Sequence, residues 1–273
     1  MNAPKIGIRD SGVGGLTVAR RIKEQVPNAD LLYFADTAHV PYGEKSVVQI
    51  RHYALSISAF LIEQGAQMVV FACNTTSALA LEAARARFEV PVFGVIEPGA
   101  RGAAQVSRGK VGVLATAATV ASGVYSREIR QLWPDLQTLE VACPAFVPLV
   151  EAQQTESLQA FEACQNYLQP LLDFGADTVV LGCTHYPLLL AHLQQIAPHI
   201  QFIDPADALA RQVAAHLAAT SAQSTKNEVN STKNQGARDT FWVSGARDGV
   251  EDWVQTLLDN PNPHLEIGPV FDL

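Results

Sequence analysis

Short apolar segments alternate with longer amphipathic ones along most of this chain. The short segments are rich in Val, Ile, Leu and Phe and end at Gly, Pro or polar residues, which is typical of buried strands. The longer segments carry apolar residues at helical spacing and have lengths that suit crossover helices between parallel strands. The alternation therefore predicts an α/β protein whose parallel strands carry helices on both faces. The predicted strands are residues 5–9, 31–35, 69–72, 91–95, 111–114, 139–142 and 178–182.

The connecting segments differ in their predicted structure. Residues 143–151 contain two prolines and are predicted to form a stiffened loop. The last strand, which ends at Gly182, leads into a loop and a helix with Pro187 near its start. Further helices are predicted at residues 16–26, 46–64, 74–87, 120–133 and 206–220.

The C-terminal part of the chain changes in composition. Residues 219–239 are rich in Ser, Thr, Asn, Gln and Lys, which predicts an exposed, mobile loop. A strand at residues 240–244 and a helix at 249–258 follow, and we expect this tail to pack against the first half of the chain.

A strand that ends in a cysteine occurs twice, about 110 residues apart. Cys73 and Cys183 each follow an apolar run and precede polar residues suited to capping a helix. Residues 6–8 resemble residues 111–113 in the same way, and residues 93–98 resemble 201–205. Three paired features in one order indicate an internal duplication. We therefore expect two similar domains, one of residues 1–97 and 209–273 and one of residues 98–208, with the two thiols facing each other across a cleft.

Composition and charge narrow the choice of partner. The chain has 273 residues, 48% of them hydrophobic and 17% charged, a net charge of −8 and a pI near 5.3. It lacks a basic cluster, so nucleic acids and anionic membranes are disfavoured and a small molecule is favoured. No apolar run is long enough for a bilayer span, and no leading apolar segment indicates export. Four cysteines are too few for a disulfide scaffold. These three observations together predict a cytoplasmic protein with reduced thiols.

Two opposed thiols suit proton transfer at a carbon acid. A thiol at a strand-to-helix turn lies beside unpaired N–H groups, which lower a thiol pKa and bind anions. One thiolate can remove a proton from one face of a carbon while the other thiol returns it to the opposite face, which inverts the stereocentre. The substrate carboxylate would be held by N–H groups near Ser11, Asn74, Thr75 and Thr184. Asp10 and His185 are placed to relay protons or to tune the thiols.

Other loops supply further candidate residues. The loop of residues 10–15 has three glycines but lacks the spacing of a dinucleotide or phosphate-binding motif. Thr116 and Thr119 either bind a carboxylate or cap a helix, with capping favoured for Thr119. Glu151 is either solvated or functional. Cys143 and Cys164 have no counterpart in the repeat and are interpreted as packing residues.

The residues alone leave several alternatives open. A Cys–His hydrolase or thiol transferase would need only one of the two cysteines. A zinc site has the right ligand types in Cys73, Cys183 and His185, but standard ligand spacings are absent. A non-catalytic sensor for small anions would use the same cleft with the thiols as packing.

Six ordered motifs together resemble the glutamate racemases of the aspartate/glutamate racemase superfamily, from about residue 6 to residue 210. They are residues 6–15, 40–43, 72–76, 112–116, 146–151 and 182–187. The resemblance implies interconversion of L- and D-glutamate for peptidoglycan synthesis, without cofactor or metal, on two flavodoxin-like domains related by pseudo-two-fold symmetry with the site between them. A racemase of aspartate or a related α-substituted carboxylate is the alternative, because backbone donors bind any carboxylate alike. A homodimer is also implied.

By position, the resemblance assigns roles to individual residues. Cys73 and Cys183 correspond to the two catalytic bases, and Asp10, Glu151 and His185 to assisting acid/base groups. The positions that correspond to substrate contacts are Ser11, Pro41, Tyr42, Gly43, Asn74, Thr75, Thr116, Thr119 and Thr184.

Three features depart from the family pattern. Arg9 occupies a position that is normally apolar, and on a strand its side chain should point away from that of Asp10. Residues 221–235 form a longer polar segment than usual, which we interpret as an insertion. The sequence shows no long N-terminal extension, so activation by a cell-wall precursor, as in extended members, is not expected.

Overall fold

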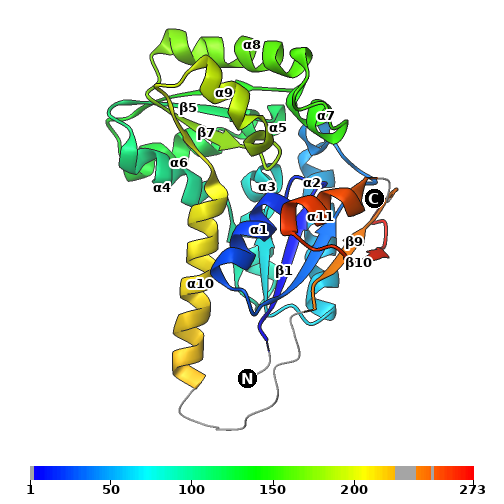
Figure 1. The fold of residues 1–273 in the computed structure, drawn as a ribbon. Coiled ribbons are helices and arrows are strands. Elements are labelled where there is room, and N and C mark those ends of the chain that lie inside the picture. Colours follow the sequence, from blue (N-terminus) through cyan, green and yellow to red (C-terminus); the bar gives the residue numbers. More distant parts are fainter. Residues whose placement is uncertain (1–2, 225–237, 247–248) are drawn as a thin grey trace.

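Two parallel sheets organise the fold in the computed structural model, which describes residues 3–224, 238–246 and 249–273 (Figure 1). The first sheet has the strand order β10-β9-β2-β1-β3-β4, and the second has the order β6-β5-β7-β8. All described strand pairs are parallel. The first sheet contains β1 (Lys5–Asp10), β2 (Asp30–Ala35), β3 (Met68–Phe71), β4 (Val92–Gly94), β9 (Thr240–Val243) and β10 (His264–Ile267). The second contains β5 (Lys110–Ala115), β6 (Gln137–Ala142), β7 (Thr178–Gly182) and β8 (Gln201–Ile203).

The two sheets repeat one plan. The order β2-β1-β3-β4 in the first sheet matches the order β6-β5-β7-β8 in the second. Cys73 follows β3 and Cys183 follows β7, which hold equivalent places in this order. The predicted α/β class with two similar parallel-sheet halves is therefore confirmed.

Helices cover both faces of the sheets. In the first half they are α1 (Leu16–Gln25), the 3₁₀ helix η1 (Tyr42–Glu44), α2 (Val47–Glu63), α3 (Asn74–Arg87), α10 (Pro205–Ser224) and α11 (Val250–Leu258). In the second half they are α4 (Ile96–Val106), α5 (Ala117–Ser122), α6 (Val124–Leu132), α7 (Phe146–Glu151), α8 (Leu158–Phe174), η2 (Tyr186–Leu189) and α9 (Leu190–Ile196). No helix in the described ranges is both long and apolar enough to cross a bilayer.

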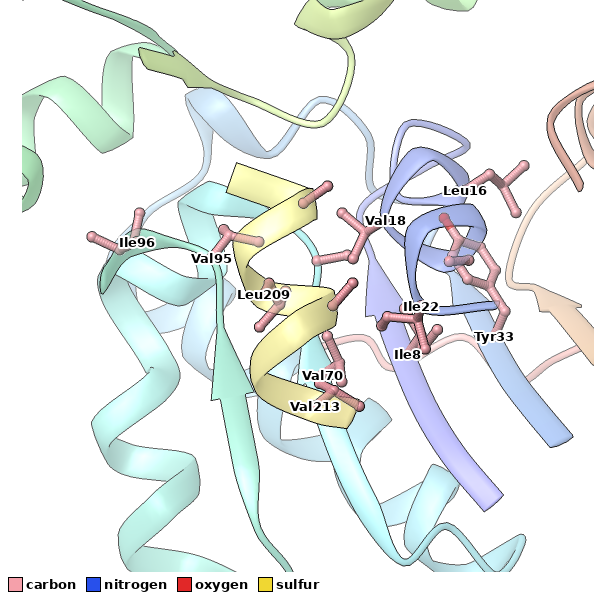
Figure 2. Packing of buried hydrophobic residues seen from close by; sticks show 14 of the residues in the cluster. Ile8, Leu16, Val18, Ile22, Tyr33, Val70, Val95, Ile96, Leu209 and Val213 are labelled. Atoms are coloured by element: carbon pink, nitrogen blue, oxygen red, sulfur yellow. The ribbon is translucent and has the colours of Figure 1, made fainter. Parts of the chain in front are cut away.

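Helix α10 joins the cores of the two halves. Its buried residues Leu209 and Val213 belong to a cluster that includes Ile8 of β1 and Val113 of β5. Figure 2 shows Leu209 and Val213 packed among side chains from the first sheet, α1 and the start of α4. Burial of this continuous apolar cluster stabilises the position of one half against the other and so defines the space between the strand ends.

Two connections differ from their predicted structure. The predicted helix at residues 120–133 begins earlier and is divided into α5 and α6, because Gly123 adopts a left-handed conformation with φ 59°. The predicted loop at residues 143–151 ends in the short helix α7. Pro148 fits there because it lies in the first turn, where a backbone N–H has no helical partner.

The C-terminal tail extends the first sheet. β9 pairs with β2, and β10, which the sequence pattern did not predict, pairs with β9. Helix α10 continues to Ser224, past its predicted end at residue 220, so the predicted mobile loop at 219–239 is partly helical. Residues 225–237 of that loop, and with them most of the predicted insertion at 221–235, lie outside the described residues. The domain limits at residues 97 and 208 stay a prediction.

Candidate active site

The carboxyl ends of strands from both sheets meet at one pocket. In open α/β sheets ligands bind at this edge of the strands. The pocket and the open solvent at its mouth together take up about 570 Å³. Its lining comes from both halves: Ser11, Pro41, Tyr42, Gly43, Glu44, Cys73, Asn74, Thr75, Thr116, Ala117, Cys143, Pro144, Val147, Cys183, Thr184 and His185.

Both predicted thiols lie in this pocket. Cys73 is the N-cap residue of α3 and is 5% exposed, and Cys183 directly follows β7 and is 7% exposed. The neighbourhood of a helix N-terminus was expected to lower a thiol pKa. For Cys73 the opposite holds, because burial and the negative charge of Asp10 raise its pKa more than Arg9 and a backbone hydrogen bond at Thr76 lower it. Cys73 is therefore mainly a thiol in the unliganded site.

Cys183 heads a chain of polar contacts. Its Sγ lies 3.6 Å from Nδ1 of His185, and Nε2 of the same ring lies 2.6 Å from Oε1 of Glu151. Burial disfavours the charged ring, but the hydrogen bonds to Cys183 and Glu151 raise the pKa of His185 well above its usual value. Burial opposes ionisation of Glu151 too, yet the contact with His185 lowers the pKa of that carboxyl. A charged imidazolium thus lies between the Glu151 carboxylate and Sγ of Cys183.

Substitution of Glu151 by glutamine tests this pair. We expect Glu151→Gln to lower the unfolding free energy by roughly 1–3 kcal/mol at pH 6, because a charge-assisted hydrogen bond is replaced by a neutral one. The pKa of Glu151 lies below its ordinary value of 4.5 when folded, so its contribution is present above pH 4.5 and is lost as pH falls through the folded value. Thermal unfolding of both proteins from pH 3 to 8 should show a Tm difference of several degrees near pH 6 that shrinks in acid. A difference that persists unchanged at pH 3 would contradict the assignment.

Asp10 lies behind the pocket rather than in its wall. Its carboxylate accepts hydrogen bonds from the backbone N–H groups of Gly12 at 3.1 Å and Gly15 at 3.0 Å. Thr184 from the other half donates to the second oxygen of Asp10 at 3.4 Å. Burial raises the pKa of Asp10, with His185 and these N–H groups opposing it. Asp10 therefore organises the glycine loop and contacts the Cys183 segment.

The glycines in the loop of residues 10–15 allow the two halves to pack closely. A Cβ at Gly14 would lie 2.5 Å from Nδ1 of His185 and 2.6 Å from Oγ1 of Thr184. A Cβ at Gly12 would lie 2.5 Å from Oε1 of Glu151. Side chains at these positions would displace the catalytic candidates, so the glycines are explained without a bound phosphate.

Three threonine hydroxyls form a cluster on the opposite wall. Thr75 contacts Thr116 at 2.9 Å and Thr119 at 3.3 Å, and Thr116 contacts Thr119 at 3.0 Å. Thr116, rather than the predicted Thr119, caps α5, because its hydroxyl accepts from the N–H of Thr119. Thr119 is fully buried behind Thr116 and does not line the pocket. Asn74 does line it, with its side-chain oxygen accepting from the Tyr125 hydroxyl at 2.6 Å.

The loop that carries Pro41, Tyr42 and Gly43 closes the pocket from one side. Tyr42 is held by hydrogen bonds, since its hydroxyl donates to Asp36 and accepts from Arg9. This loop is therefore a fixed wall of the pocket.

Five further residues line the pocket that sequence reasoning missed as site residues: Glu44, Ala117, Cys143, Pro144 and Val147. Cys143 packs in the apolar cluster of the second half, as predicted, and its buried side chain is also part of the pocket lining. Its place directly after β6, at the same edge as the other strand ends, was the signal that pointed to it. Cys164 in α8 is fully buried and lies apart from the pocket.

Among the described residues, no group of three or more His, Cys, Asp and Glu side chains is arranged to hold a metal ion. The predicted catalytic candidates Cys73, Cys183, His185, Asp10 and Glu151 all gather at this one site, either lining the pocket or in contact with residues that do.

Comparison with known proteins agrees with this geometry. The pattern of the Asp/Glu/Hydantoin racemase family matches residues 13–213. A glutamate racemase from Desulforudis audaxviator is 42% identical over 269 residues, which cover 96% of this chain and 97% of that protein. A crystal structure of a glutamate racemase from Bacillus anthracis matches with a TM-score of 0.90 at 30% identity and covers 99% of both chains. A structure from Francisella tularensis, a glutamate racemase in complex with D-glutamate, matches with a TM-score of 0.88 at 30% identity and covers 98% of both chains. The chain therefore belongs to the Asp/Glu/Hydantoin racemase family.

Proposed function

We propose that this chain interconverts L- and D-glutamate by two-base proton transfer at Cα, with Cys73 and Cys183 as the bases. The observation that carries the proposal is that these two thiols, supplied by equivalent strand ends of the two halves, line one pocket. The chain is a glutamate racemase, an isomerase, and it supplies D-glutamate for peptidoglycan synthesis. The extent of its similarity to the Desulforudis audaxviator protein supports glutamate as the substrate.

The reaction balances without a redox partner. One thiolate takes the α-proton, an S–H bond forms, and the electron pair of the broken C–H bond remains on the substrate as a carbanion delocalised into its carboxylate. The opposite thiol then gives its proton to the other face of Cα and becomes a thiolate. The two thiols have exchanged protonation states, and the reverse reaction uses them in exchanged roles.

Hydrogen-bond donors around the pocket favour the charged intermediate. We assign the substrate carboxylate to backbone and side-chain donors at Ser11, Asn74, Thr75, Thr116 and Thr184. The start of α3 offers N–H groups without helical partners, which stabilise the negative charge that develops as the proton leaves. Pro41, Tyr42 and Gly43 complete the wall, while Thr119 acts through its contacts with Thr75 and Thr116.

The acid/base groups assist the thiols from behind. His185, charged and held by Glu151, stabilises the thiolate of Cys183 during turnover. Asp10 acts on the Cys73 side by its charge, which favours the protonated thiol there. We further propose that the reaction needs no cofactor and that the chain acts in the cytoplasm as a homodimer, as the family resemblance implies.

Proton exchange in D2O tests the function directly. Purified protein treated with a metal chelator and freed of pyridoxal phosphate should replace the α-proton of L-glutamate by deuterium while the optical rotation falls to zero. L-Aspartate under the same conditions is the matched control and should not exchange at a comparable rate. One-dimensional proton NMR and polarimetry measure the two events. Exchange with aspartate alone, or with neither amino acid, would overturn the proposal.

A further inference from the structure

Arg9 is a fully buried cation without a carboxylate partner. Its side chain is 0% exposed, and within the described part of the chain no carboxylate lies within salt-bridge distance of it. Its guanidinium lies over the rings of Phe71 at 5.4 Å and Tyr42 at 5.5 Å. One nitrogen, Nη2, donates to the Tyr42 hydroxyl at 3.2 Å, but Nε and Nη1 have no hydrogen-bond partner. Such an arrangement costs stability unless a nearby group compensates the charge.

Arg9 lies on β1 beside the segment that leads to Cys73, since its backbone carbonyl accepts a hydrogen bond from the N–H of Ala72 at 3.1 Å. Arg9 pairs in register with Phe71 on β3, so both side chains lie on one face of the sheet. Phe71 precedes Cys73 by two residues, and Tyr42, which lies beneath the guanidinium, shares both an apolar cluster and the pocket wall with Cys73. The charge of Arg9 also acts on the thiol, where it lowers the pKa that burial raises.

The charge of Arg9 also lowers the pKa of Asp10, but the other titratable groups around Arg9 are neutral or have closer hydrogen-bond donors. Tyr33 and Tyr42 remain neutral, because burial raises the pKa of both phenols well above its usual value. Asp10 already accepts from two backbone N–H groups and Thr184. Asp36 already accepts from Tyr42, His39 and Ser244. Cys73 differs from these groups. It becomes a thiolate during turnover, and no cationic side chain of the described residues contacts it directly.

We propose that Arg9 is a positioning residue for the reaction: its buried guanidinium supplies the positive charge that stabilises the thiolate of Cys73 when this residue acts as the base. The inference rests on the proposed function of Cys73. It gives the two thiols different cationic partners, His185 for Cys183 through a direct contact and Arg9 for Cys73 through space. The unpaired Nε and Nη1 groups of Arg9 lower the stability of the fold, and the charge that they belong to serves catalysis.

Alkylation of Cys73 measures this coupling without any racemase assay. Trypsin releases residues 52–85 as one peptide with Cys73 as its single cysteine, whereas Cys143, Cys164 and Cys183 share the peptide 131–211. The rate of iodoacetamide modification of peptide 52–85, followed by mass spectrometry from pH 7 to about 11.5, reports the thiolate fraction of Cys73. We expect Arg9→Met to move the midpoint up by about one pH unit and to slow modification about tenfold at neutral pH. Arg9→Lys, which keeps the charge, should stay close to the wild type.

Thermal unfolding separates this role from a structural one. If Arg9 only fills space, Arg9→Met leaves the alkylation midpoint unchanged, and that result overturns the proposal. If Arg9 acts by charge, the midpoint rises while Tm is kept or increased, because two unpaired buried donors are removed. Arg9→Gln provides a second neutral variant should Arg9→Met fail to fold. A shifted midpoint in a protein that does not racemise glutamate would leave the coupling intact and reject the proposed function instead.

Discussion

Replacing Cys73 or Cys183 by serine is expected to lower kcat for glutamate racemisation about a thousandfold, because each direction of the reaction uses both sulfurs, one as base and one as acid. A serine hydroxyl is too weak an acid to ionise in this buried pocket. The loss should be similar for the two variants and for both enantiomers as substrate. Polarimetry with L- and D-glutamate, run in parallel, measures it.

Cys164 provides the matched control for these variants. It is buried in α8 apart from the pocket, and burial raises its pKa to about 12, so it takes no part in proton transfer. Cys164→Ser should keep wild-type kcat even if it lowers Tm. A Cys73→Ser or Cys183→Ser protein with wild-type kcat would instead support a mechanism with a single thiol, as in a Cys–His hydrolase.

The sequence pattern predicted the strands that build the site because those strands are buried on both faces. β3, β5 and β7 lie in the interior of their sheets and consist largely of apolar residues, which need no tertiary information to recognise. The duplication then placed Cys73 and Cys183 at equivalent strand ends. Together these two observations were enough to predict a shared cleft, which the pocket confirms.

Local conformation was harder to predict where one residue decides it. Gly123 breaks a helical pattern that is otherwise continuous, and a glycine inside such a pattern is often tolerated. Pro148 suggested a loop, although proline is also compatible with the first turn of a helix. The edge strand β10 is half exposed and short, so its apolar pattern is weak.

The electrostatics of the site could not be predicted from motifs. A helix N-terminus lowers a thiol pKa in a solvated site, but the desolvation of Cys73 outweighs that effect in this one. Arg9 was expected to point away from Asp10, and nothing in the sequence indicated that Tyr42 and Phe71 would hold its guanidinium. These effects depend on burial and distance between residues far apart in sequence.

The second large effect is expected for His185→Asn, which should lower kcat about a hundredfold. Asparagine can place an amide near the position of Nδ1, but it cannot carry the charge that stabilises the Cys183 thiolate, and it is too short to reach Glu151. Glu151→Gln removes the partner and keeps the imidazole, so its loss of kcat should be less than about tenfold.

The relative kcat of the His185→Asn and Glu151→Gln variants distinguishes a chemical role for His185 from a structural one. If the histidine only anchors α7 through Glu151, the two substitutions break the same contact and should lower kcat and Tm alike. If its charge serves Cys183, His185→Asn is the far slower enzyme at equal Tm. His192→Asn is the matched control, because this histidine of α9 contacts the Thr155 carbonyl away from the pocket and should be replaceable without loss of kcat. Initial rates of all three variants at pH 7 to 9, compared with their melting curves, decide between a charged partner for Cys183 and a structural link.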